Sequence, residues 1–339
     1  MTAERSDAQL VLDLMDAFRR SKAMFAAVSL GIFDRLEMSP AGTRELSAEK
    51  KCHPGALERL LDTCVALDLL GRQGERYRNL PVAARYLCQD SPDTLAGYIL
   101  YSNQILYSLW GHLEDAVREG ASRWEQTFGG KTSLFEGLFA TEESKRDFLQ
   151  AMHGMGRLSS PSVVASVDLS SFRRLCDVGG ATGHLAMAAC SRYPGLQATV
   201  FDLPEVAPQA RRFIAAAGWA ERIGVQEGDF FRDPLPPADL YALGRILHDW
   251  SEEKITFLLE KIYRQLPDAG GLLVCEKILN PGKDGPLNAN LQSLNMLVLT
   301  EGGQERTAAE YESLLARAGF RDFQVRPTGQ PLDAILAIK

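Results

Sequence analysis

The chain lacks most features that mark secreted, metal-bound or membrane proteins. Its 339 residues include six cysteines and five histidines, with no CxxC pair and no Cys/His cluster at zinc spacing. Scattered cysteines of this kind favour reduced thiols in a cytoplasmic protein. No apolar run approaches the roughly 20 residues that span a bilayer, and the polar N-terminus lacks the apolar segment of a secretory signal. We therefore expect no metal and no membrane partner.

Basic residues are also outnumbered by acidic ones. The formal net charge is −7, from 37 Lys and Arg against 44 Asp and Glu. This balance argues against broad nucleic-acid binding, which needs a positive footprint. With 45% hydrophobic and 24% charged residues the chain has the profile of a folded globular protein, and its 339 residues predict about two domains.

The apolar pattern changes near residue 165. Before it, every long periodic segment has helical spacing. Residues 7–36 predict one or two helices whose apolar positions cover more than one face, which favours a subunit interface over packing within the chain alone. Residues 94–160 are also helical in pattern and are expected to bridge two halves and line a pocket.

Residues 43–86 have the outline of a winged helix: two helices and a small hairpin. Pro54 marks a helix start, and Gly71 and Gly74 are expected to bracket the turn. A winged helix often binds DNA. Here the candidate recognition helix, 55–69, has one basic residue against three acidic ones, which disfavours DNA binding because phosphate contacts come mainly from Lys and Arg.

From residue 170 onward, short β-rich runs alternate with helical runs. This order predicts a largely parallel sheet covered on both faces, with ligands at the carboxyl ends of its strands. The expected strands are residues 175–178, 198–202, 223–226, 240–243, 272–275, 323–325 and 334–337. The expected helices are residues 185–193, 208–217, a segment capped by Ser251 that runs to Leu266, and a segment capped by Thr307 that ends at Gly319.

A glycine loop joins the first of these strands to a helix. Asp177 precedes it, and its glycines are Gly179, Gly180 and Gly183. Nineteen residues later Asp202 ends the second strand, where a carboxylate can bind both ribose hydroxyls. Nicotinamide dinucleotides and S-adenosylmethionine share this geometry. The dinucleotide fingerprint needs glycines at offsets 0, 2 and 5, but here they fall at 0, 1 and 4, and the acidic residue before the loop suits a cationic ligand. A purely structural turn is the remaining alternative.

A third polar strand end follows at Gly228, Asp229 and Phe230. The carboxylate can accept a hydrogen bond from an adenine amino group, and the phenyl ring can stack on the base. Alone this is an ordinary strand-to-loop turn. Three such strand ends in one sheet make the cofactor interpretation stronger.

His248 follows the fourth strand and is the candidate general base. The alternative is a histidine that packs or caps at a strand end. A phenol has a pKa of about 10 and histidine about 6.5, so full transfer of the proton before the reaction would be costly. We therefore expect proton removal in concert with methyl attack, and we expect a carboxylate to stabilise the imidazolium that forms. Glu276 and Glu305 are candidates for that role, although both could be surface charges.

Five motifs occur in order along the chain: Asp-Val-Gly-Gly-Ala-Thr-Gly, Val-Phe-Asp-Leu-Pro-Glu, Glu-Gly-Asp-Phe-Phe, Arg-Ile-Leu-His-Asp-Trp and Gly-Gly-Gln-Glu-Arg-Thr. With them the chain resembles class I S-adenosylmethionine-dependent small-molecule O-methyltransferases of the plant caffeate type. Ser-Leu-Asn-Met-Leu-Val at 293–298 and the segment 228–236 resemble the acetylserotonin branch of that family. The resemblance covers essentially the whole chain.

The resemblance implies a homodimer whose protomers complete each other's pockets. It implies a winged-helix-like dimerisation domain over 1–100, bridging helices that line the pocket over 101–165, and a Rossmann-like doubly wound, seven-stranded α/β methyltransferase domain over 166–339. It also implies S-adenosylmethionine as methyl donor, with S-adenosylhomocysteine as product, and a small aromatic acceptor.

The family's site residues carry over position by position. The base matches His248, and the acids that support it match Glu276 and Glu305. The expected cofactor-binding residues are Asp177, Gly179, Gly180, Gly183, Asp202, Leu203, Gly228, Asp229, Phe230 and Arg245. The expected substrate-binding residues are Asp249, Asn295, Leu299, Met152, Met155 and Met296; the three methionines could equally be core residues.

The chain departs from the acetylserotonin branch at several positions. Leu299 stands where that branch has a glutamine that helps hold the substrate's acetylamido group, so indole specificity is in question. Gly156 replaces an aromatic residue and Phe139 a tyrosine of the cofactor pocket, and Gly302–Gly303 has one glycine more than the vertebrate pattern.

We expect methyl transfer to a phenolic hydroxyl of a small aromatic acceptor, with an N-acetylserotonin-like compound as one candidate. Two alternatives remain. One is a family member with non-methylating chemistry, such as a decarboxylase, hydroxylase or pericyclase. The other is a non-enzymatic winged-helix DNA-binding or scaffold protein.

Overall fold

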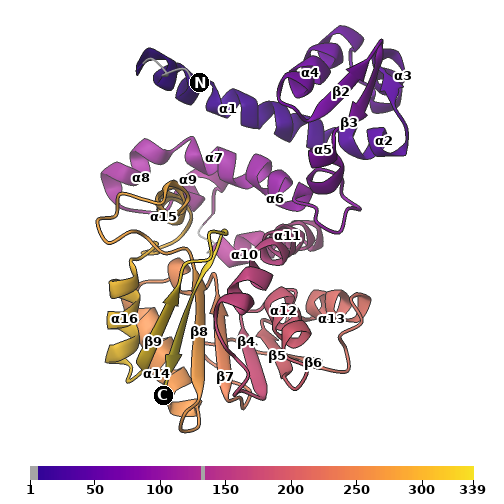
Figure 1. Cartoon of the computed structure of the whole chain (residues 1–339). Coiled ribbons are helices and arrows are strands. Elements are labelled where there is room, and N and C mark those ends of the chain that lie inside the picture. The colour runs from indigo at the N-terminus through magenta and orange to yellow at the C-terminus, as the bar shows by residue number, and fades with distance from the viewer. Residues whose placement is uncertain (1–6, 131–133) are drawn as a thin grey trace, which may run out of the picture. The chain divides into compact units, whose positions relative to one another are not determined.

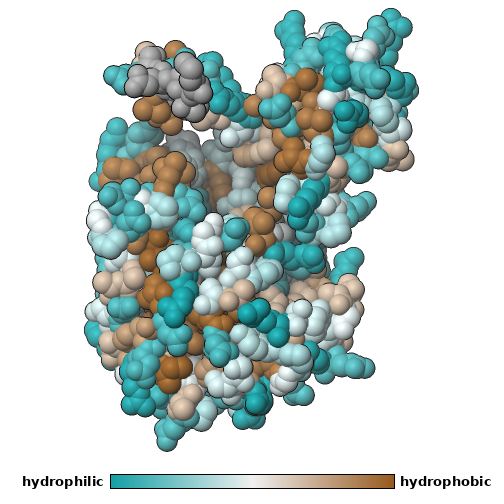
Figure 2. Space-filling model, viewed as in Figure 1, coloured by the Kyte–Doolittle hydropathy of each residue, from teal (hydrophilic) through white to brown (hydrophobic). Residues whose placement is uncertain are grey.

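The computed structural model describes residues 7–130 and 134–339. The chain divides into two compact units, one ending at Gln104 and the other beginning at Ile105 (Figure 1). On the face seen in Figure 2, hydrophilic residues predominate and hydrophobic residues gather in patches among them. Within the described ranges, no helix is long and apolar enough to cross a membrane.

The N-terminal unit combines helices with a three-stranded antiparallel sheet of order β1-β3-β2. Pro54 stands at the first helical position of α4, where a missing N–H costs little. The expectation that Gly71 borders the hairpin turn is wrong, because Gly71 lies within β2 and pairs with Arg78. The elements are α1 Asp7–Ser29, α2 Ile32–Met38, β1 Ala41–Gly42, α3 Thr43–Lys50, α4 Pro54–Ala66, β2 Leu70–Gln73, β3 Arg76–Asn79, α5 Pro81–Tyr86 and α6 Ala96–Tyr101.

Helix α1 carries an uncovered apolar surface. Only Ala27 and Val28, near its C-terminal end, are buried. Its earlier turns expose Leu10, Val11, Leu12, Leu14, Met15 and Phe18, each at least half exposed. An apolar surface of this kind marks an interaction site, and it is the surface at which the sequence predicts a subunit interface.

A seven-stranded sheet of order β6-β5-β4-β7-β8-β10-β9 organises the second unit. The strands from β6 to β8 in this order are parallel, and β10 is antiparallel to both β8 and β9. The largely parallel sheet predicted from the sequence is confirmed. The antiparallel edge arises because β9 and β10 are joined by a short loop that cannot make a crossover. The strands are β4 Arg174–Val178, β5 Gln197–Asp202, β6 Ile223–Glu227, β7 Leu240–Gly244, β8 Gly271–Glu276, β9 Arg321–Arg326 and β10 Asp333–Ile338.

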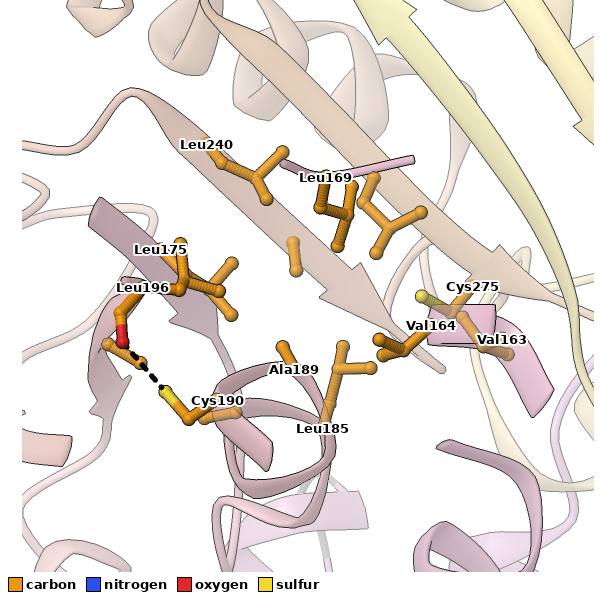
Figure 3. Close-up of a cluster of buried hydrophobic side chains, with 14 of the residues drawn as sticks. Val163, Val164, Leu169, Leu175, Leu185, Ala189, Cys190, Leu196, Leu240 and Cys275 are labelled. Atoms are coloured by element: carbon orange, nitrogen blue, oxygen red, sulfur yellow. Dashed lines mark hydrogen bonds between the residues drawn. The ribbon is translucent and has the colours of Figure 1, made fainter. Parts of the chain in front are cut away.

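Helices cover both faces of this sheet, as predicted. Along β7, Leu240 and Ala242 join a core with α11, α12 and α13, whereas Tyr241 and Leu243 join a core with α14 and α16. Figure 3 shows the first core, where the Cys190 thiol donates to the carbonyl of Leu196. The helical elements that follow α6 along the chain, not all of which cover the sheet, are η1 Ser102–Leu106, α7 Tyr107–Trp110, α8 Leu113–Glu119, α9 Trp124–Phe128, α10 Leu134–Leu138, α11 Glu142–Ser166, α12 His184–Arg192, α13 Ala207–Ala216, η2 Leu247–Asp249, α14 Glu252–Gln265, α15 Leu287–Leu299 and α16 Ala308–Arg317.

Two details differ from the sequence-based expectations. Ser251 stands at the start of α14 but makes no side-chain cap, whereas Thr307 caps α16 by accepting from the backbone of Glu310. Helix α15 was not among the expected helices. Its apolar residues do not form one stripe, since Leu287 is exposed and Met296 is buried, so its amphipathic period is weak.

Candidate active site

The glycine loop after β4 is tight because side chains fill the space beside it. A Cβ at Gly179 would lie 2.5 Å from the side chain of Ile246, and one at Gly180 would lie 2.6 Å from the carboxyl of Asp177. Gly179 has φ +67° and Gly183 has φ +77°, conformations that favour glycine. The loop is thus held in a conformation that favours glycine, with Gly179 partly exposed and Gly180 and Gly183 buried. Close approach of a ligand to its backbone stays a prediction.

Asp202 is fixed at the end of β5 by two backbone hydrogen bonds. Its Oδ2 accepts from the N–H of Ala181 at 2.8 Å, and its Oδ1 accepts from the N–H of Leu203 at 2.8 Å. Burial raises the pKa of this carboxyl to about 6. The same side chain thus holds the glycine loop in place and presents a carboxylate at the edge of the sheet.

The third strand end brings Asp229 and Phe230 to the same edge. Gly228 is required there, because a Cβ would lie 2.5 Å from the ring of Phe201. Asp229 Oδ1 accepts from the N–H of Phe231 at 2.8 Å. The Nζ of Lys261 donates to the carbonyl of Phe230 at 2.9 Å, so a cation on α14 anchors this loop.

Aromatic rings surround that loop. Trp250 lies 5.0 Å from Phe231 and 6.4 Å from Phe230, centroid to centroid, and 6.0 Å from Phe135 on α10. Its indole N–H is buried and has no partner among the described residues. The His-Asp-Trp motif identifies this segment, but no pattern along the chain indicates how its tryptophan packs.

Arg245 follows β7 with an unusual backbone and an unsatisfied side chain. Its φ of 57° is in the left-handed region, and its N–H donates to the carbonyl of Cys275 at 3.1 Å. The Nε and Nη2 atoms are buried without a hydrogen-bond partner in the described part of the chain. Because buried donors without a partner are costly, these two atoms are suited to a ligand that accepts hydrogen bonds.

Two buried carboxylates meet at one ring nitrogen of His248 in the candidate site. Its Nδ1 is 2.7 Å from Glu305 Oε1 and 3.2 Å from Glu276 Oε2. The other oxygen of Glu276 accepts from the backbone N–H groups of Ile246 and Leu247 at 2.9 and 2.8 Å. Both glutamates are about 1% exposed, so the alternative that they are surface charges is wrong.

These carboxylates control the protonation of His248. Burial by itself would lower the pKa of the imidazole, but the charges of Glu276, Glu305 and Asp249 raise it to about 10. Burial in turn raises the pKa of Glu276 to about 7 and that of Asp249 to about 6. His248 is therefore a stronger base than an ordinary histidine, close to a phenol.

His248, Glu276 and Glu305 also have ligand atoms within 4.8 Å of one another, a separation compatible with a metal ion. Two ligands on one ion are each about 2.0–2.2 Å from it and so stand well apart. The 2.7 Å between Nδ1 and Glu305 Oε1 is instead the length of a charge-assisted hydrogen bond. The geometry favours a supported base over a metal centre.

The expected substrate wall lies on two helices. Asn295, Met296 and Leu299 lie on α15 and are buried, with Asn295 Oδ1 accepting from the indole N–H of Trp110 at 2.9 Å. Helix α15 packs against η2, which carries His248 and Asp249. Met152 and Met155 lie on α11 and are partly buried.

Two further histidines tie α11 to the glycine loop, and sequence reasoning missed both. His153 Nδ1 lies 2.7 Å from the hydroxyl of Thr182, and His184 Nδ1 lies 2.9 Å from the hydroxyl of Ser160. Burial lowers the pKa of the two imidazoles to about 4 and 3, so both are neutral. A Cβ at Gly156 would lie 2.2 Å from the His184 ring. Gly156 thus makes room for this ring.

Comparison with known proteins places the chain in a family. The O-methyltransferase domain profile matches residues 110–321, and the O-methyltransferase dimerisation domain profile matches residues 12–89. The chain is 44% identical to the human acetylserotonin O-methyltransferase over 338 residues, covering 98% of this chain and 97% of that protein. The chicken acetylserotonin O-methyltransferase is 39% identical, with 98% and 97% covered.

Two solved structures have the same fold. The crystal structure of human N-acetylserotonin methyltransferase in complex with SAM matches with a TM-score of 0.94 at 43% identity, covering 100% of this chain and 99% of that one. The structure titled PigF with SAH matches with a TM-score of 0.89 at 32% identity, covering 99% and 100%. Given the profile matches and the relatives that align along nearly its whole length, this chain belongs to the O-methyltransferase family.

Proposed function

We propose that this protein transfers a methyl group from S-adenosylmethionine to a phenolic hydroxyl of a small aromatic acceptor, with N-acetylserotonin as the leading candidate. The observation that carries the proposal is the pairing of His248 Nδ1 with Glu305 at 2.7 Å at the same sheet edge as the glycine loop. A base held by a buried carboxylate at the same sheet edge as the glycine loop suits proton removal next to a bound cofactor.

The residues present fit S-adenosylmethionine. Gly179 and Gly180 leave no room for side chains, Asp202 suits the ribose hydroxyls, and Asp229 with Phe230 suits adenine. The unpartnered donors of Arg245 suit the carboxylate of the methionine part. When bound, this cofactor supplies a methyl group on a positively charged sulfur. Relatives solved with SAM and with SAH support the assignment.

In the proposed mechanism, His248 Nε2 accepts the proton of the acceptor hydroxyl; bound S-adenosylmethionine would supply the methyl group to that oxygen and would leave as S-adenosylhomocysteine. The Nδ1–H donates to Glu305, which keeps Nε2 free to act as the base. Glu276, held by two backbone N–H groups, stabilises the imidazolium that forms. The carboxylates raise the pKa of His248, so its neutral form is a strong acceptor for the phenol proton, and holding the reactants in line supplies the rest of the acceleration.

The acceptor is expected against Asp249 and Asn295. The expected apolar wall consists of Leu299, Met296, Met152 and Met155. We propose a homodimer formed partly by the exposed apolar surface of α1, in line with the dimerisation-domain match. The cytoplasmic location remains a prediction from the cysteines. The intact His248–Glu305 pair favours methyl transfer over non-methylating chemistry, and the acidic α4 and the family match disfavour a DNA-binding or scaffold role.

The first test is calorimetric titration with S-adenosylhomocysteine, followed by incubation with S-adenosylmethionine and a set of phenols that includes N-acetylserotonin. We expect micromolar binding and stoichiometric formation of S-adenosylhomocysteine and an O-methyl product by mass spectrometry. An acceptor that is altered without formation of S-adenosylhomocysteine would favour non-methylating chemistry. Absence of binding would overturn the cofactor site.

A further inference from the structure

One side of helix α11 is bonded to the glycine loop and to the start of α12. His153, Gly156 and Ser160 are three and four positions apart, a spacing that places them on the same side of a helix. His153 Nδ1 lies 2.7 Å from the hydroxyl of Thr182 in the loop. Ser160 Oγ lies 2.9 Å from Nδ1 of His184, the first residue of α12. Two side-chain contacts thus join the loop and the helix that follows it to α11.

The loop contains a strained residue beside the first of these contacts. Ala181 has a φ of 48°, in the left-handed region that is unfavourable for a residue with a Cβ. Its N–H donates to Asp202 Oδ2 at 2.8 Å, so β5 holds the loop at this residue. Thr182, the next residue, is held from α11 by His153. Polar contacts from two different elements therefore keep the strained backbone in place.

The contact between His153 and Thr182 acts on the shape of the loop. Thr182 is 0% exposed, so its hydroxyl is closed to a ligand, and His153 is its only hydrogen-bond partner among the described residues. The His153 ring packs against Phe213 of α13, with 4.3 Å between the ring centroids, which fixes its orientation. Burial lowers the pKa of this imidazole to about 4, so a neutral ring makes the contact.

We propose that His153 is a positioning residue for the cofactor: through Thr182 it holds the strained glycine loop in the conformation that binds S-adenosylmethionine. The inference rests on the proposed function and adds a residue to its cofactor site. Asp202, the expected ribose ligand, is bonded to the same loop at Ala181, so a displaced loop would also displace this carboxylate. Loss of the contact should therefore weaken cofactor binding and leave proton removal by His248 intact.

The first experiment removes the hydroxyl of Thr182 at nearly constant volume. Thr182→Val should raise the Kd for S-adenosylhomocysteine, measured by calorimetry, and the KM for S-adenosylmethionine about 3- to 30-fold. At saturating cofactor, kcat and the KM for N-acetylserotonin should change less than about twofold. Thr182→Ser keeps the hydroxyl and should bind S-adenosylhomocysteine within about threefold of wild type. Unchanged affinity in Thr182→Val, or an equal loss in both variants, would overturn the positioning role.

The second experiment asks whether His153 acts through Thr182. His153→Phe keeps an aromatic ring against Phe213 and removes the ring nitrogen, so it should weaken S-adenosylhomocysteine binding about as much as Thr182→Val. In a Thr182→Val background it should add little. His53→Phe, at an exposed histidine of the N-terminal unit, is the matched control and should leave the Kd unchanged. Full additivity of the two losses would overturn the inference.

The third experiment tests the strain at Ala181. Glycine adopts the left-handed region without the Cβ penalty, so Ala181→Gly should improve the affinity of the Thr182→Val variant by at least about threefold. A further loss in that background would contradict a strained loop held by His153. If Thr182→Val does not fold, as judged by circular dichroism, Ala181→Gly is tested in the His153→Phe background with the same expectation.

Failure of this inference is distinguishable from failure of the proposed function. Absence of S-adenosylhomocysteine binding by the wild-type protein would overturn both. Binding by the wild-type protein that neither Thr182→Val nor His153→Phe weakens would overturn only the role of His153.

Discussion

Replacement of Glu305 by glutamine should change both the rate of the reaction and its dependence on pH. The carboxylates of Glu276, Glu305 and Asp249 together raise the pKa of His248 from 6.5 to about 10 in spite of its burial. Glu305 is the carboxylate nearest to the ring, with Oε1 2.7 Å from Nδ1. An opposite charge at this distance typically changes a pKa by about 1–3 units, so loss of the Glu305 charge should lower the apparent pKa of the base by about that amount.

The direction of the expected change in the pH profile depends on which protonation form of His248 is active. The neutral imidazole accepts the proton, so kcat/KM should rise with pH and level off above the apparent pKa. Glu305→Gln should move that rise to lower pH. It should also lower the plateau about 10- to 100-fold, because the base is weaker and the imidazolium loses its stabilising charge.

Folding stability gives an independent readout of the same interaction. The pKa of His248 is raised in the folded state, so its contribution to stability is complete below about pH 6.5 and is lost as the pH rises towards 10. Glu305→Gln should therefore destabilise the protein more at pH 6 than at pH 10, as measured by thermal unfolding.

The measurement is a pH series of kcat/KM for the wild-type protein, Glu305→Gln and Glu301→Gln. Glu301 is an exposed carboxylate in the same loop, so its replacement controls for a change of net charge and should leave the profile unmoved. An unchanged inflection and plateau for Glu305→Gln would refute the argument that this carboxylate sets the basicity of His248.

Four further perturbations test other parts of the site. His248→Ala should keep affinity for S-adenosylhomocysteine within about threefold while abolishing most turnover; retained turnover would remove the base assignment. Asp202→Ala should weaken S-adenosylhomocysteine binding about 10- to 100-fold by calorimetry, since it frees the glycine loop and removes charged hydrogen bonds, and equal affinity would contradict its role. Gly156→Ala should lower the free energy of unfolding by about 1–3 kcal/mol through the contact with His184, and His184→Ala should restore it in the double variant. Treatment with EDTA should leave activity unchanged, and a loss that added divalent metal restores would contradict a metal-free base.

Much of the fold could be predicted because the evidence for it is local. The alternation of short β-rich runs with helices requires a parallel sheet with two covered faces, and the observed strands begin and end within a few residues of the expected ones. Helix α15 escaped prediction because its apolar residues lie on several sides. The antiparallel pairing of β10 with β8 depends on contacts across the sheet and not on local pattern.

The sequence by itself determined which residue types stand at the sheet's carboxyl edge, because the end of each strand is marked by its own short motif. It identified the glycine loop, Asp202 and His248 in this way. Only the tertiary structure decided that Glu276 and Glu305, from β8 and from a loop 57 residues beyond His248, meet on one ring nitrogen. Likewise, only the structure paired Trp110 with Asn295 across 185 residues. The physical reason is that hydrogen bonds and burial depend on which residues are neighbours in space. The spacing of residues along the chain does not show which distant side chains will come into contact.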